Sequence, residues 1–145
     1  MDLIIEGDFL PGLPEILSAM RTNGADFMWH LADVEASTWP QHIDDCWIAG
    51  SDLMSTWVPN ETQFIWGVLD AFPDGRTSEI GERPYADGNQ SFWTGEPLTP
   101  QLDGAAFEIV YWDSDSVLLI GLTAEQTASV LAEMPRAKYL SSLNE

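Results

Sequence analysis

The densest group of side chains that could bind a metal ion or transfer protons lies between residues 30 and 45. It consists of two imidazoles and four carboxylates, from His30, Asp33, Glu35, His42, Asp44 and Asp45. Two imidazoles with one or two carboxylates form a ligand set that suits zinc. If residues 28–35 form a strand, however, His30 points to one face while Asp33 and Glu35 point to the other. We therefore predict no metal site and expect the carboxylates to form a solvated acidic edge.

The other common catalytic templates do not occur in the sequence. Cys46 has His30 and His42 as candidate partners, but a lone cysteine beside Trp47 and Ile48 is typical of a small buried hydrophobic residue. The chain has no Gly-x-Ser-x-Gly turn, no phosphate-binding loop ending in Lys-Ser or Lys-Thr, and no dinucleotide-binding glycine pattern. The sequence thus predicts no catalytic residues, no cofactor and no enzyme activity.

The elements that must position these side chains follow from apolar periodicity and turn residues. Pro14 opens a helix over residues 14–22, which Asn23-Gly24 is expected to end. Alternating or continuous apolar residues predict strands at 3–5, from 27 onward, at 46–50 and at 63–72, while residues 51–58 fit either a strand or a helix. Residues 73–104 are rich in proline and glycine, and we expect loops lying over the sheet with a short strand near Phe92-Trp93.

The last third of the chain carries the clearest local signals. Asp113-Ser114-Asp115-Ser116 begins like a calcium loop but lacks the glycine and the distal bidentate glutamate, so it predicts a hairpin turn between strands at 106–112 and 116–122. Thr123 and Gln126 match a capping box for a helix ending near Met134. We predict a single α+β domain over residues 1–145, with an antiparallel sheet packed against an N-terminal and a C-terminal helix.

The charge of the chain restricts its partners. The 24 Asp and Glu residues outnumber the 5 Lys and Arg residues, which gives a net charge of −19, and no Lys or Arg occurs from Thr22 to Gly75. Such a surface repels nucleic acid and anionic lipid, so we expect neither as a partner. One cysteine, an acidic N-terminal segment and the lack of a long apolar stretch predict a cytoplasmic protein that does not span a membrane.

Large aromatic residues lie among the acids of this same segment. Five tryptophans are spaced 10, 8, 10 and 9 residues apart, at Trp29, Trp39, Trp47, Trp57 and Trp66. We expect most of them in the core and one or two at the surface. Aromatic anchors ringed by carboxylates are typical of a surface that binds a basic protein. The predicted partner-binding residues are Asp33, Glu35, Trp39, Asp44, Asp45, Trp47 and Asp52, and a second acidic patch is expected at Glu79, Glu82 and Asp87.

Three sequence segments are similar to those of a known class of inhibitor. They are Phe9-Leu10-Pro11 before the first helix, Met28-Trp29-His30-Leu31 in an aromatic strand, and the late strand pair that begins Phe107-Glu108-Ile109-Val110. In these segments, in size and in acidity, the chain resembles bacterial immunity proteins, which neutralise toxins delivered between competing cells. The resemblance implies a cognate toxin with a basic surface whose active site is occupied or blocked by the acidic surface of this chain.

Two alternative functions stay open at this point. A phage-type inhibitor that mimics DNA would carry arrayed carboxylates on an exposed face. A small ligand-binding protein or hydrolase would instead contain a deep pocket with convergent polar groups.

Overall fold

The protein is built around a seven-stranded antiparallel sheet. The computed structural model describes residues 1–36, 44–60, 63–73 and 75–144. The strand order is β3-β2-β4-β5-β6-β1-β7. The strands are β1 (Leu3–Glu6), β2 (Phe27–Ala36), β3 (Cys46–Ala49), β4 (Phe64–Pro73), β5 (Phe107–Trp112), β6 (Ser116–Ile120) and β7 (Ala137–Tyr139). The first strand therefore lies between two of the last strands.

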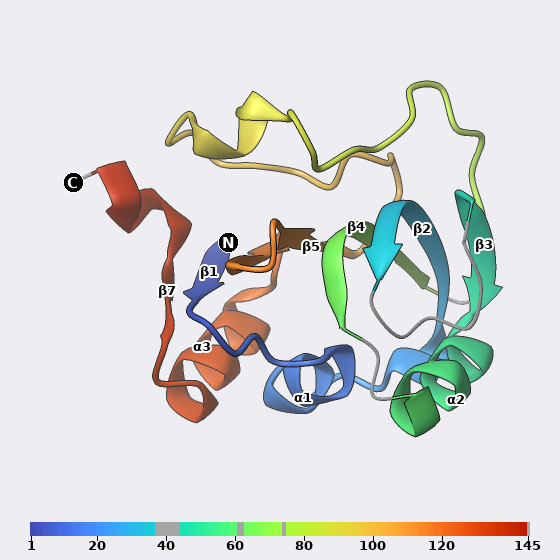
Figure 1. Ribbon diagram of the computed structural model, residues 1–145, viewed down its shortest axis with the longest axis horizontal. Helices are drawn as coiled ribbons and strands as arrows, with labels where there is room; N and C mark the ends of the chain where they lie inside the picture. The colour runs from blue at the N-terminus through green and yellow to red at the C-terminus, as the bar shows by residue number, and fades with distance from the viewer. Residues whose placement is uncertain (37–43, 61–62, 74, 145) are drawn as a thin grey trace.

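The two faces of the sheet have different covers. Three α-helices lie on one face: α1 (Leu13–Ala19), α2 (Gly50–Asn60) and α3 (Ala124–Glu133). The long segment of residues 75–104, which we call the strap, crosses the other face (Figure 1). Short 3-10 helices are η1 (Gly24–Asp26), η2 (Gln90–Trp93) within the strap, and η3 (Leu140–Asn144). The predicted α+β class, with terminal helices packed on an antiparallel sheet, is confirmed.

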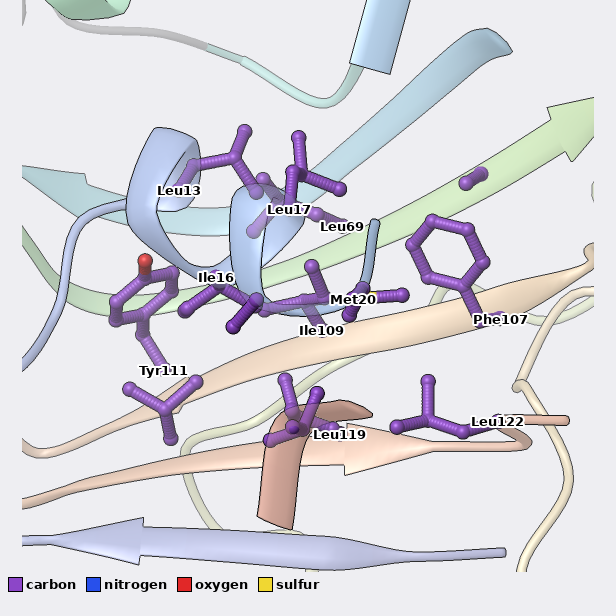
Figure 2. Packing of buried hydrophobic residues seen from close by; sticks show 14 of the residues in the cluster. Leu13, Ile16, Leu17, Met20, Leu69, Phe107, Ile109, Tyr111, Leu119 and Leu122 are labelled. Carbon is purple, nitrogen blue, oxygen red and sulfur yellow. The ribbon is translucent and has the colours of Figure 1, made fainter. Parts of the chain in front are cut away.

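The larger core lies between the helices and the sheet. Leu13, Ile16 and Leu17 of α1 are buried against Ile109 and Leu119 of the central strands (Figure 2). Trp29 is fully buried in the same layer, and its indole N–H donates to the carbonyl of Gly24 at 2.9 Å. Because side chains alternate between the two faces of a strand, every second residue of these strands points into this helix-side core.

A second core lies beneath the strap. Ile4, Val68, Val110 and Leu118 of the sheet are buried there with Phe92 of the strap. Both faces of the central strands are thus covered, which explains why β4, β5 and β6 are almost continuously apolar in sequence. The strap is a structural layer of the protein, as the aromatic residues within it predicted.

The start of α3 gives a local test of stability. The hydroxyl oxygen of Thr123 accepts from the backbone N–H of Gln126 at 3.1 Å, and the Gln126 side chain accepts from the Thr123 N–H at 3.0 Å. The predicted capping box is confirmed. Replacing Thr123 with Ala should lower the free energy of unfolding by about 1 kcal/mol, measured by urea denaturation, while Thr123→Ser should lose less. A loss no larger for Ala than for Ser would contradict this role of the hydroxyl.

Two local predictions were wrong, one segment had been left open, and one strand was missed. The first helix ends at Ala19, and the left-handed residue that follows it is Arg21, with a φ of 54°, so the helix does not continue to 22. Residues 90–93 form the 3-10 helix η2 where a strand was expected near Phe92-Trp93. The ambiguous segment 51–58 is helical. Strand β7 was not predicted, because its three residues carry no alternation that distinguishes it from a loop.

A β-bulge in β2 overturns the predicted facing of its side chains. The register with β4 shifts between Ala32 and Glu35, and Asp33 takes a left-handed φ of 54°. After the shift Glu35 stands opposite Trp66, which packs on the strap-side core. Glu35 therefore shares a face with His30, contrary to the expectation from simple alternation, because the extra residue reverses the parity of the strand.

Candidate functional site

The first predicted site residue, Asp33, ties the strap to the sheet. One of its carboxylate oxygens accepts from the backbone N–H groups of Ala86 and Asp87, each at 3.0 Å. The left-handed backbone at the bulge aims this side chain toward the strap, and aspartate tolerates that conformation better than most residues. Asp33 thus has a definite structural role at the edge of the candidate surface.

Asp45 lies beside Asp33 and binds the same part of the strap. Its carboxylate accepts from the backbone N–H of Asp33 at 3.1 Å and from Nε and Nη2 of Arg83, the second at 3.0 Å. Arg83 Nη2 also lies 3.7 Å from Asp33 Oδ1. Partial burial acts to raise the pKa of Asp45, but the hydrogen bonds from Arg83 and Asp33 and the charge of Arg83 hold this pKa below its ordinary value. Asp45 therefore stays charged.

The remaining predicted residues are divided between the two sides of the molecule. Glu35 and Asp44 are exposed near the strap-side edge formed by β2 and β3. Trp47 is partly buried there, with its ring centroid 4.9 Å from that of His30 and 5.0 Å from that of Phe72. Asp52 is exposed in the first turn of α2, in the helix layer (Figure 1). The structure brings Asp33 and Asp45 together and separates them from Asp52, while Trp39 lies outside the described residues.

A row of three buried ionisable side chains crosses the sheet beneath the strap. His30 of β2 stands opposite Asp70 of β4, and Asp70 stands opposite Glu108 of β5. Their exposed fractions are 2%, 0% and 0%. The backbone N–H of Gln101 in the strap donates to Glu108 Oε1 at 2.9 Å. Among the described residues, Nδ1 of His30 and both carboxyl oxygens of Asp70 have no hydrogen-bond partner of ordinary geometry.

Burial controls the protonation of this row. It raises the pKa of Asp70 to about 10, and the neighbouring charge of Glu108 adds to the rise. Burial also raises the pKa of Glu108, against the adjacent Asp70 carboxyl and the hydrogen bonds from Gln101, which lower it. The pKa of His30 is lowered by burial, although the charge of Asp45 opposes the change. At neutral pH we therefore expect a neutral His30 and a proton held by the two carboxyls.

Sequence reasoning missed Asp70 and Glu108 as a pair. Their signal was available, because each interrupts a strand whose neighbours on the same face, Val68, Phe72 and Val110, are apolar. Because these apolar neighbours face the interior of the protein, an acid on the same face of the strand is expected to be buried with them. Such an acid is unusual, since acids are rarely fully buried. Within the part of the chain that the structure describes, no three His, Cys, Asp or Glu side chains are arranged to hold a metal ion.

Cys46 and His30 do not form a catalytic pair. Cys46 packs against the helix-side core, while His30 lies on the strap side of the sheet. Burial, with the charges of Asp45 and Asp44, raises the pKa of the Cys46 thiol and disfavours the reactive thiolate. His42, the other candidate partner, lies outside the described residues.

Comparisons with known proteins do not assign a function to this site. Comparisons with protein-family models, with curated proteins and with solved structures find no match to this chain. No helix within the described residues has both the length and the apolar character needed to cross a bilayer. A function must therefore be inferred from the arrangement of the side chains.

Proposed function

We propose that this protein is a cytoplasmic immunity-type inhibitor, which binds and neutralises a cognate toxin with a basic surface. The observation that carries the proposal is the exposed acidic edge formed by β2 and β3, where Glu35 and Asp44 reach solvent. The nearby guanidinium of Arg83 is bonded to Asp45 and lies 3.7 Å from Asp33, so its charge is shared between those two acids. This edge offers negative charge to an approaching protein.

The overall charge gives such an edge a kinetic advantage. With a net charge of −19, the chain attracts a basic protein over the range of the Debye length, about 8 Å at physiological salt. Electrostatic steering raises association rates from about 10⁵–10⁶ to 10⁸ M⁻¹s⁻¹ or more at low salt. An inhibitor that must capture a toxin before it acts benefits from that speed.

The proposal is tested by calorimetric titration with the toxin domain encoded beside this chain. We expect tight binding that weakens as salt rises from 50 to 500 mM. A Glu35→Gln/Asp44→Asn variant should bind about tenfold more weakly, mainly through slower association. The matched control is Glu125→Gln/Glu133→Gln, which removes two exposed acids from α3 on the helix side and should change binding little.

Two results would contradict the proposal. One is the absence of binding to that toxin domain at any salt concentration. The other is equal weakening by the two double variants, because only total charge would then matter. Binding to a DNA-binding protein in competition with duplex DNA, without toxin binding, would instead favour the DNA-mimic alternative.

A further inference from the structure

Three tryptophans meet on the strap side of the sheet. Trp66 comes from β4, Trp112 from the end of β5, and Trp93 from η2 in the strap. The Trp66 and Trp112 ring centroids are 5.0 Å apart with the planes at 66°, and those of Trp93 and Trp112 are 5.0 Å apart at 83°. Phe92, which is 3% exposed, lies behind Trp112 at 6.0 Å. Segments far apart in sequence thus form one aromatic cluster.

Each indole in this cluster is only partly buried. Trp66, Trp93 and Trp112 pack against the strap-side core and keep part of their surface in water. Among the described residues, none accepts a hydrogen bond from their indole N–H groups, whereas the N–H of buried Trp29 is bonded to Gly24. Tryptophans gathered at a surface are the residue type most enriched among the strongest contacts of protein interfaces.

The rim of this cluster is acidic. Glu35 stands directly opposite Trp66 in the β2–β4 register and is exposed, and the exposed Asp113 directly follows Trp112 in the chain. Three of the five basic side chains are bonded to other groups. Arg83 binds Asp45, Lys138 binds Glu6 at 3.0 Å on β7, which is three strands from β5, and Arg136 bonds to the carbonyls of Glu6 and Phe9.

We propose that Trp66, Trp93 and Trp112 form the contact surface for an arginine-bearing segment of a basic partner protein. A guanidinium is planar and weakly hydrated, so it stacks on an indole face and pairs with a carboxylate such as Glu35 at the same time. The partner's basic character rests on the proposed function, and the contact surface is the new element. A second copy of this chain is a poor occupant, because its charge of −19 repels the acidic rim.

The experiment titrates ¹⁵N-labelled protein with the peptide Ac-Arg-Gly-Arg-Gly-Arg-NH₂ and follows the indole N–H signals by NMR. The signals of Trp66, Trp93 and Trp112 should shift, while those of Trp29 and Trp47 should not. The corresponding glutamate peptide should cause no shift. A Trp66→Leu/Glu35→Gln variant should bind the arginine peptide at least fivefold more weakly, and the helix-side control Glu125→Gln/Glu133→Gln should bind it normally.

Three results would overturn this surface. They are no shift at the three indoles, equal shifts at Trp47, and indole shifts on dilution without peptide, which would indicate a second copy.

Toxin titrations separate the two proposals. Unchanged toxin affinity of Trp66→Leu alone, which leaves Glu35 and Asp44 in place, would exclude this surface and leave the inhibitor function standing. Peptide binding at the three indoles without any toxin binding would support the surface and contradict the inhibitor function.

Discussion

The Asp70→Asn variant should lose the pH dependence of stability that the wild-type protein owes to Asp70. Asp70 has an ordinary pKa of 3.8 and a folded-state pKa raised to about 10, so the folded protein holds a proton that the unfolded chain releases between these values. Its contribution to stability is complete below pH 3.8 and is lost as pH rises toward 10. The wild-type free energy of unfolding should fall by up to about 1.4 kcal/mol per pH unit in this window.

The comparison between variants isolates this proton. In Asp70→Asn the side-chain amide can donate to Glu108 without titrating, so the variant should gain up to about 4 kcal/mol relative to wild type between pH 5 and pH 8. Urea denaturation at several pH values measures the difference. Glu35→Gln removes an exposed acid and serves as the control, and its stability should follow the wild-type slope. Parallel slopes for wild type and Asp70→Asn would refute a proton held at Asp70.

The second large effect is expected for Asp33→Ala, which should detach part of the strap. The substitution removes the acceptor for the N–H groups of Ala86 and Asp87, and it places alanine at a φ of 54°. Lost hydrogen bonds to a charged group and the left-handed backbone together should lower the free energy of unfolding by about 2–4 kcal/mol. Urea denaturation gives the total, and amide hydrogen exchange at Ala86 and Asp87 locates the change.

A conservative variant isolates the contribution of the negative charge at Asp33. Asp33→Asn keeps an acceptor oxygen and tolerates the left-handed conformation, so it should lose less than half as much stability as Asp33→Ala. The amides of Ala86 and Asp87 should exchange faster in the alanine variant than in the asparagine variant. Unchanged exchange at both amides in Asp33→Ala would show that the strap is held by other contacts.

The sequence predicted the parts of the fold that depend on neighbouring residues. The capping box at Thr123 and Gln126 requires two side chains three positions apart, and the hairpin turn at Asp113-Ser114 requires residues that accept positive φ. Both conditions are local, so both could be recognised. The α+β class followed from the order of such elements.

The candidate site was less predictable because it depends on distant partners. Asp33 and Asp45 were predicted as exposed acids, but their carboxylates are bonded to Arg83, Ala86 and Asp87, which lie 38 to 54 positions away in the sequence. No local pattern states that the strap returns to this edge of the sheet. The residue types indicated an acidic surface, and only the tertiary structure shows which acids are already bonded.

The tryptophans show a similar limit. We expected most of Trp29, Trp39, Trp47, Trp57 and Trp66 in the core. Of the three whose side chains are described, Trp29 is buried, and Trp47 and Trp66 are partly exposed. Trp29 lies in the helix-side core, whereas Trp47 and Trp66 lie on the strap side of the sheet. Spacing along the chain places a residue on a strand, but it does not show how completely the neighbouring layer covers the side chain.

The position of β1 between β6 and β7 has a consequence for synthesis of the protein. Leu3, Ile4 and Ile5 leave the ribosome long before β6 and β7, which pair with them on both sides. This part of the sheet cannot close until both later strands have been made, and pairing across such sequence separation is slow. In a newly made chain, the apolar strand β1 should therefore stay unpaired until β6 and β7 are available. During that time chaperones and proteases compete with folding.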